Sequence, residues 1–198
     1  SISKNFKRIY LTSVKKIFLG SNYTIPIPKF GDKNKITKNK FKLIIVFGGN
    51  DPKSIVFKIW KFFYKLNFKK IFICNDDTFN KLKMYNNSNN IFKKKLSSNN
   101  FYRLFNMCEF FFSTASNIMI EGIFLGKKGM VTSIQSRQKK LGYIYNKKND
   151  IIYIGHYNEL NEKKILLSLK RLFSKKTTLR LKKSNLIARY KRIMNEFI

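Results

Sequence analysis

The sequence has few of the residues on which enzyme active sites and metal sites most often depend. Of its 198 residues, one is histidine, two are cysteine and 10 are acidic. Cys74 and Cys108 lack the spacing of metal ligands, and each lies in or beside an apolar segment, so we expect buried free thiols in a reducing compartment. His156 has no partner residue in a recognisable motif. The sequence alone therefore assigns no catalytic residue, no metal site and no cofactor.

Long apolar segments are also absent. No run of about 18 apolar residues occurs, so we expect no membrane-spanning helix. The first 20 residues are basic, but they contain neither the apolar core nor the cleavage site of a signal peptide. We therefore expect a cytoplasmic protein. The sequence does not begin with methionine, which fits either a processed chain or a fragment of a longer one.

Arginine is scarce relative to lysine. The 42 basic residues outnumber the 10 acidic ones and give a net charge of +32, yet only seven of them are arginine. Strong positive charge is typical of proteins that bind nucleic acids or other polyanions, but such proteins often use arginine for bidentate phosphate contacts. An AT-rich genome also favours Lys, Asn, Ile and Phe over Ala, of which there are two. Both explanations of the charge are open, and the location of the lysines distinguishes them.

Short apolar segments alternate with amphipathic helical patterns along most of the chain. The predicted strands are 43–47, 70–74, 91–95, 110–113, 129–134 and 151–155. The predicted helices are 52–66, 79–84, 101–108, 118–125, about 137–146 and 160–173. Alternation at these lengths predicts an α/β fold with a doubly wound parallel sheet.

Composition divides the chain into three parts. Residues 1–41 end in an extended segment with Pro26 and Pro28 and a lysine-rich polar linker at 31–41. Residues 42–175 contain the alternating strands and helices. Residues 176–198 are basic and include a last predicted helix at 185–197.

The first predicted strand runs directly into a tight glycine turn. Gly48 and Gly49 permit backbone angles that other residues avoid, and they let a ligand approach the main chain. Asp51 is suited to the N-cap of the next helix and Pro52 to its first position. A strand, a glycine turn and a helix start together present free N–H groups to a phosphate. The same residues also form ordinary strand-to-helix connections, so both interpretations are open at this point.

Three loops at the carboxyl ends of predicted strands carry small or polar residues, at 48–51, 113–117 and 133–138. Ligands of doubly wound sheets bind at these ends. Loop 113–117 opens a helix, so its hydroxyl and amide groups suit a diphosphate. Glu121 lies one turn into that helix in an otherwise apolar stretch, where it either binds a diol such as a ribose or faces solvent. The candidate binding residues are Gly48, Gly49, Asn50, Asp51, Ser113, Thr114, Ser116, Asn117, Glu121 and Gln138.

Three segments in the same order and spacing resemble one known family. They are FLGSNYTIPIPKF at 18–30, IIVFGGNDPKSIVFKIW at 44–60 and FYRLFNMCEFFFSTASNIMIEGIFLGKKGMVTSIQSRQ at 101–138. Together they resemble the C-terminal half of the UDP-sugar hydrolase of pseudaminic-acid biosynthesis. That family is related to the lipid II N-acetylglucosaminyltransferase and shares its GT-B fold. The resemblance covers residues 18 to 155.

The resemblance implies a Rossmann-like UDP-binding domain and the release of UDP from a UDP-linked diacetamido amino sugar. Glu121 and Gln138 fall on a glutamate and a glutamine of the family. By resemblance, Glu121 binds the ribose, loops 48–51 and 113–117 bind the diphosphate, and Gln138 binds the sugar or the phosphates. The implied partner is a UDP-sugar, and no cofactor is implied.

The chain also departs from the family pattern. Ile27 and Lys29 stand near the family's arginine and at its glutamate, Ser116 and Asn117 replace a Gly-Ser pair, and Arg137 replaces an asparagine. The family's N-terminal domain, with its glycine-rich loop and catalytic histidine, has no counterpart in this sequence. We therefore expect the UDP-binding half of a two-domain cleft, with residues 1–41 as the tail of the missing domain.

Three alternatives are open. A GT-B glycosyltransferase would have the same nucleotide site. A basic nucleic-acid-binding or ribosomal protein of an AT-rich genome would explain the charge but not the three loops. A degenerate remnant of the family would bind UDP weakly or not at all. The predicted C-terminal helix either packs on another domain, as in GT-B proteins, or is a solvated amphipathic helix.

Overall fold

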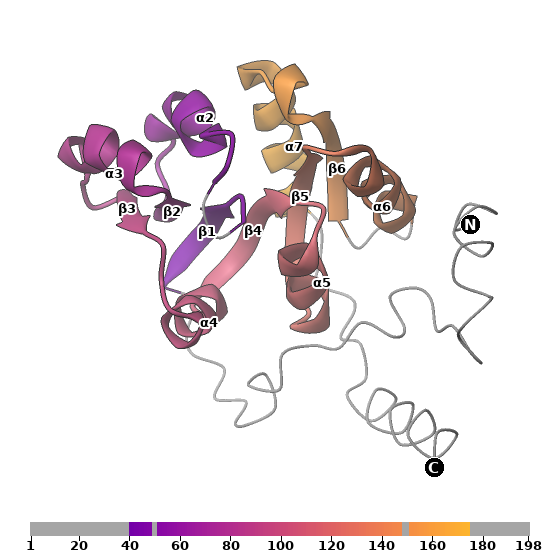
Figure 1. Ribbon diagram of the computed structural model, residues 1–198, viewed down its shortest axis with the longest axis horizontal. Coiled ribbons are helices and arrows are strands. Elements are labelled where there is room, and N and C mark those ends of the chain that lie inside the picture. The colour runs from indigo at the N-terminus through magenta and orange to yellow at the C-terminus, as the bar shows by residue number, and fades with distance from the viewer. Residues whose placement is uncertain (1–39, 49–50, 148–150, 175–198) are drawn as a thin grey trace, which may run out of the picture. The chain divides into compact units, whose positions relative to one another are not determined.

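Six parallel strands form one sheet in the computed structural model, which describes residues 40–48, 51–147 and 151–174 (Figure 1). The strands are β1 (Phe41–Val46), β2 (Lys70–Cys74), β3 (Asn90–Lys94), β4 (Cys108–Thr114), β5 (Lys128–Ser133) and β6 (Ile151–His156). The helices are α2 (Ile55–Tyr64), α3 (Asp76–Leu82), α4 (Ser98–Asn106), α5 (Asn117–Phe124), α6 (Ser136–Lys147) and α7 (Glu162–Ser174). Two short 3-10 turns, η3 (Lys83–Tyr85) and η4 (Tyr157–Glu159), complete the described elements.

The strand order is β3-β2-β1-β4-β5-β6, and every neighbouring pair is parallel. The chain builds outward from β1 to β3, returns to place β4 on the other side of β1, and then builds outward to β6. This arrangement confirms the predicted α/β fold with a doubly wound parallel sheet. The winding direction reverses between β1 and β4, and ligands of such sheets bind beside that switch point.

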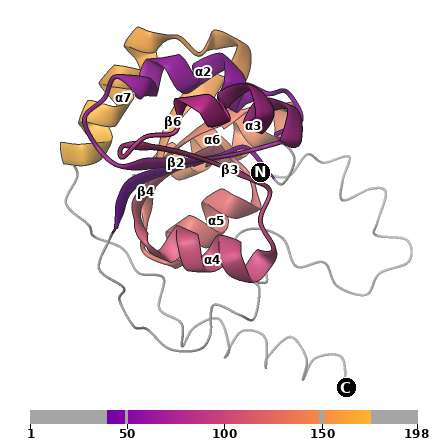
Figure 2. The same cartoon turned by 90° about the vertical axis from the view of Figure 1, so that its left-hand side faces the viewer.

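Helices cover both faces of the sheet. Helices α2, α3 and α7 pack on one face, whereas α4, α5 and α6 pack on the other, and Figure 2 shows α4 and α5 opposite α2 and α7. In β1, Leu43 and Ile45 join the first core, and Ile44 and Val46 join the second. Burial on both faces explains why the strands appear in the sequence as uninterrupted apolar segments.

All six predicted strands are present, but three helix starts were wrong by three residues each. Helix α2 begins at Ile55 rather than at Pro52, because Asp51 and Ser54 adopt left-handed backbone angles with φ of 41° and 46°. The resulting turn, closed by a hydrogen bond from Ser54 N to Asp51 O of 2.9 Å, separates the strand from the helix. Helix α3 begins at Asp76 and helix α4 begins at Ser98, each three residues before the predicted start.

The predicted C-terminus of helix α5 is confirmed. Gly126 follows the helix with φ of 70°, and its N–H donates to Ile123 O at 2.9 Å. The left-handed residue after the helix is a common helix end, and glycine adopts it without steric cost.

Cys74 and Cys108 are both buried free thiols, as predicted. Burial is the largest cause that raises the pKa of each thiol to about 12. Both therefore stay protonated at neutral pH and act as small apolar side chains.

Several sequence predictions lie outside the described residues. They include the extended segment and linker, apart from Lys40 and Phe41, and the helix at 185–197. The division of the chain into 1–41, 42–175 and 176–198 stays a prediction. None of the helices in the described ranges is long and apolar enough to serve as a membrane span.

Exposed lysines occur over both faces of the sheet in the part of the chain that the structure describes. They lie on α2, α3 and α7 on one face and on α6 on the other, at Lys58, Lys61, Lys81, Lys163, Lys170, Lys139, Lys140 and Lys147. A distribution over opposite faces favours codon bias over a single polyanion-binding surface.

The ring of Phe111 on β4 occupies the space where α5 approaches the sheet. Gly122 on α5 and Gly129 on β5 both lie against this ring, and a Cβ atom on either glycine would overlap it. The two glycines therefore allow the helix, β4 and β5 to pack around one buried aromatic side chain.

We expect Gly129→Ala to lower the free energy of unfolding by about 1 to 3 kcal/mol, because the added methyl overpacks the core against the ring of Phe111. Urea denaturation of the parent, G129A, F111L and the double variant measures this. The cost of G129A should shrink in the F111L background, where the smaller side chain leaves room. Equal costs in both backgrounds would show that the ring is not the source of the clash.

Candidate functional site

The carboxyl ends of β1 and β4 lie side by side at the switch point of the sheet. Val46 pairs with Ser113 in the parallel register, so the chain segments that follow both strands leave the sheet at the same edge. Gly48, which follows β1, and loop 113–117, which follows β4, are thereby brought to the same edge of the sheet. Gly49 and Asn50 lie outside the described residues.

Gly48 is the first residue after the buried Phe47 and has a φ of 75°. This left-handed conformation favours glycine. A Cβ atom at Gly48 would meet no other atom within 4 Å, so its backbone angle, and not crowding, requires the glycine. Gly48 is also one of the residues that line the pocket described below.

Asp51 caps helix α2 from outside the N-cap position. Its Oδ1 accepts a hydrogen bond from Ile55 N at 2.8 Å, and its Oδ2 accepts one from Val56 N at 3.0 Å. The N-cap residue is Ser54, which makes no side-chain cap, so the prediction of Asp51 at the N-cap was wrong by three positions. Burial raises the pKa of Asp51, and the two amide hydrogen bonds oppose that shift. Both carboxylate oxygens of Asp51 are thus bound to the start of α2.

Hydroxyl groups cluster in the loop from Ser113 to Asn117. Thr114 Oγ1 and Ser116 Oγ lie 2.9 Å apart, and Ser113 Oγ donates to Thr114 O at 3.0 Å. Ser116 is the N-cap of α5 but makes no side-chain hydrogen bond to the helix. The exposed Asn117 is the first helical residue. The first N–H groups of α5 thus receive no cap from Ser116, and such groups suit an anion.

A pocket of about 240 Å³ lies between α4 and α5 beside the end of β1. Its apolar walls are formed by Val46, Ile73, Leu96, Phe101 and Ile118. Its remaining lining residues are Gly48, Lys95, Ser98, Tyr102 and Glu121. An apolar pocket with a few convergent polar groups at a switch point is the usual form of a small-molecule site in α/β proteins.

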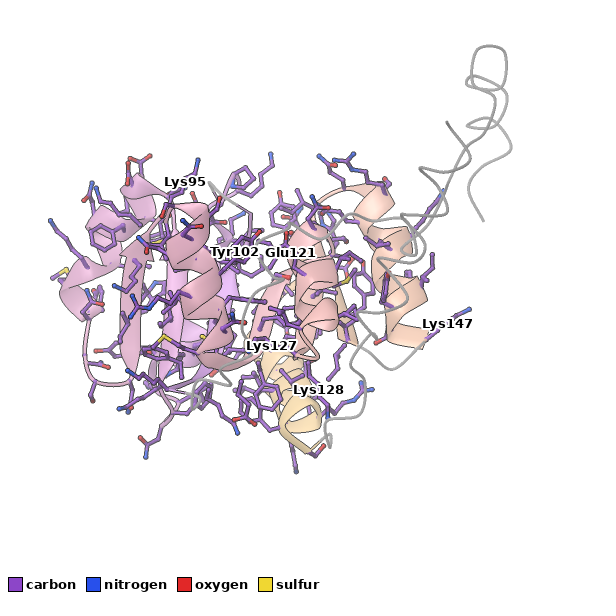
Figure 3. The ribbon with its side chains drawn as sticks, turned by 90° about the horizontal axis from the view of Figure 1, so that it is seen from below. Lys95, Tyr102, Glu121, Lys127, Lys128 and Lys147 are labelled. Carbon is purple, nitrogen blue, oxygen red and sulfur yellow. The ribbon has the colours of Figure 1, made fainter. Side chains whose placement is uncertain are left out.

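Tyr102 on α4 and Glu121 on α5 meet in this pocket. Figure 3 shows the two side chains next to each other between the helices, with Lys95 near the start of α4. The distance from Tyr102 Oη to Glu121 Oε1 is 3.3 Å, and the hydroxyl donates. Glu121 therefore points into the pocket, so of the two orientations that the sequence left open the structure favours the inward one.

Burial and their mutual hydrogen bond shift the pKa values of both side chains. Burial is the largest cause that raises the pKa of Glu121, and the hydrogen bond from Tyr102 opposes the shift. Burial, followed by the charge of Glu121 and the hydrogen bond to it, raises the pKa of Tyr102 to about 12. The phenol is therefore protonated at neutral pH and remains the donor.

Gln138 lies outside the residues that line the pocket. Its Oε1 accepts hydrogen bonds from Ile134 N at 2.7 Å and Gln135 N at 3.3 Å, so this amide shapes the loop between β5 and α6. The Nε2 of His156 lies 3.2 Å from Ile134 O, which places the histidine beside the same loop. The sequence offered no reason to expect His156 there.

Three polar residues of the pocket lining, Lys95, Ser98 and Tyr102, were not predicted from the sequence. Lys95 and Ser98 follow the carboxyl end of β3, so the rule that selected the other loops would have found them had it been applied to this strand. Tyr102 gave no sequence signal, because its partner depends on how α4 and α5 pack. Among the described residues, no group of three or more His, Cys, Asp or Glu side chains forms a metal site.

Solved structures of the GT-B type share this fold. UDP-GlcNAc 2-epimerase from Methanocaldococcus jannaschii matches with a TM-score of 0.53 and 15% identity over 79% of this chain and 45% of that chain. MurG from Acinetobacter baumannii matches with a TM-score of 0.53 and 9% identity, over 68% and 41%. UGT89C1 from Arabidopsis thaliana, complexed with UDP-L-rhamnose, matches with a TM-score of 0.52 and 9% identity, over 80% and 40%.

The chain spans less than half the length of each of these three proteins. No protein-family model matches the sequence, and no curated protein matches it significantly. At these identities the likeness concerns the fold, an α/β Rossmann-like domain that is shared with GT-B proteins.

We expect Asp51→Ala to destabilise the protein by about 1 to 2 kcal/mol, because two amides at the start of α2 lose a buried acceptor. Asp51→Asn should cost less, since its one carbonyl oxygen keeps one of the two bonds. Urea denaturation provides the measurement, with Asp77→Ala on the exposed first turn of α3 as the control, expected within about 0.5 kcal/mol of the parent. A parent-like D51A would contradict the capping role.

Proposed function

We propose that this chain is the nucleotide-sugar-binding half of a GT-B protein and that its ligand is a UDP-sugar. The observation that carries the proposal is the carboxylate of Glu121, which lies in an apolar pocket at the switch point of the sheet. A carboxylate accepts two hydrogen bonds from a vicinal diol, and a ribose presents one. Glu121 is also the residue that the resemblance assigns to the ribose.

The nucleoside part of the ligand occupies the pocket between α4 and α5. A volume of about 240 Å³ suits a fragment of that size, and Phe101 and Ile118 offer apolar surface to a planar base. Glu121 then accepts hydrogen bonds from the ribose hydroxyls. Lys95 and Ser98 at the pocket wall provide hydrogen-bond donors for polar atoms of the base.

The diphosphate lies across the start of α5. This helix begins at the edge where β1 and β4 end, and its first N–H groups and positive dipole end favour an anion. Ser116 and Asn117 contribute from the helix start, and Gly48 contributes backbone beside the pocket. Gln138 is assigned to the sugar or phosphates by the resemblance alone, through its side-chain NH₂ group, because its carbonyl oxygen already serves the loop.

The reaction that we propose for the whole protein is hydrolysis of a UDP-linked diacetamido amino sugar. It rests on the three segments that resemble the hydrolase family. A glycosyltransferase is the second candidate, and the shared GT-B fold supports it equally well. In either case the catalytic groups are supplied by a second, N-terminal GT-B domain. A nucleic-acid partner is less well supported, since the described lysines occupy both faces of the sheet.

We expect the chain to bind UDP in a calorimetric titration and Glu121→Ala to weaken binding at least tenfold, because the ribose loses its acceptor. Glu121→Gln keeps the shape of the side chain but loses its charge, so its affinity for UDP should lie between those of the parent and Glu121→Ala. Glu109→Gln is the matched control, because Glu109 pairs with Lys42 at 2.8 Å near the start of β4 and lies outside the pocket lining. Thermal unfolding of each variant checks that the fold is intact.

Absence of binding by the parent chain at millimolar UDP would overturn the proposal. Equal weakening by E109Q and E121Q would contradict a specific contact between Glu121 and the ligand. Binding of ADP as tightly as UDP would contradict a uridine-specific pocket. We expect the chain alone to release no UDP from a UDP-sugar, whereas a reconstituted two-domain protein would do so as hydrolase or transferase.

A further inference from the structure

The hydrogen bond between Tyr102 and Glu121 links the two helices that flank β4 in the sequence. Tyr102 lies in α4, which precedes β4, and Glu121 lies in α5, which follows it. Tyr102 is 9% exposed, and its hydroxyl oxygen lies 3.3 Å from one oxygen of the carboxylate. Both side chains line the same pocket and lie next to each other in Figure 3. The pair is therefore positioned to act on whatever the pocket holds.

A carboxylate in an apolar pocket has two difficulties as a ligand-binding group. Burial favours its protonated form, which binds a diol less well because it has lost one acceptor. The side chain of a glutamate also has several rotamers, and only some of them reach the ligand. A fixed hydrogen-bond donor addresses both difficulties, because it favours the charged form and holds one oxygen in place.

Tyr102 is the uncharged donor with the geometry to do this. Lys95, from the segment after β3, is the other charged side chain that lines the pocket, and Ser98 of α4, Ile118 of α5 and the strand residues Val46 and Ile73 are neutral. The phenol stays protonated throughout the physiological range, so its role as donor does not change with pH.

We propose that Tyr102 is a positioning residue for Glu121: its hydroxyl holds one carboxylate oxygen and leaves the other oriented toward the diol of the ligand. This inference rests on the proposed function, since it takes a nucleotide as the ligand. It assigns to α4 a role in recognition, although Tyr102 itself acts through Glu121.

Tyr102→Phe tests the inference, because it removes the hydroxyl and keeps the ring. We expect UDP binding to weaken about tenfold at pH 7. Without the donor the pKa of Glu121 rises further, so the variant protonates this carboxylate at a higher pH than the parent does. Affinity, which depends on the ionised form, is therefore lost at a higher pH as the solution is acidified.

The decisive measurement is the ratio of the dissociation constants of Y102F and the parent between pH 5 and 8.5. Protonation of UDP itself is common to both proteins and cancels in this ratio. We expect the ratio to be smallest at high pH, where both carboxylates are ionised, and to grow as pH falls. Tyr143→Phe, an exposed tyrosine on α6 outside the pocket lining, is the matched control and should bind as the parent does.

A second measurement needs no ligand. The carboxyl ¹³C signal of Glu121, assigned by its loss in E121Q, should titrate with a higher midpoint in Y102F than in the parent. A ratio that does not change with pH, together with an unchanged midpoint, would overturn the positioning role and leave the proposed function intact. Failure of the parent to bind UDP would overturn the proposed function and, with it, the assignment of a nucleotide to this pair.

Discussion

The reversal of winding between β1 and β4 is the constraint on which the candidate site depends. Because β4 pairs with β1 rather than with β3, the helix before β4 and the helix after it come to the same face of the sheet. Helices α4 and α5 therefore lie beside the carboxyl ends of two adjacent strands. The pocket, its polar residues and the start of α5 all result from this one topological feature.

Core packing fixes the position of the carboxylate within this frame. Glu121 directly precedes Gly122, and Gly122 lies against the ring of Phe111, which in turn lies against Gly129. The backbone of α5 is thus held close to β4 and β5 at the turn that carries Glu121. With the helix backbone held in this way, the position of the carboxylate depends on the rotamer of Glu121, and Tyr102 is hydrogen-bonded to that carboxylate.

Much of the fold could be predicted from the sequence, because strands that are buried on both faces appear as uninterrupted apolar segments. The β4 segment, with Phe110, Phe111 and Phe112, is the clearest case. Helix starts were harder, because Asp51 and Ser54 adopt left-handed angles that their residue types do not require. The three candidate loops were predicted from their place after strands. Tyr102 was not, since a contact between two helices depends on their packing and leaves no local pattern in either segment.

The capping of α2 by Asp51 joins the helix start to the residue that follows β2. Both carboxylate oxygens are bound by amides of the first helical turn, and Asn75 Nδ2 donates to the backbone oxygen of Asp51 at 3.3 Å. Asp51 is therefore held in place while the first turn of α2 stays intact. Asp51, the start of α2 and Asn75 after β2 form one hydrogen-bonded unit, and amide hydrogen exchange at Ile55 and Val56 reports its opening. The start of α2 is thus organised by contacts within the fold itself.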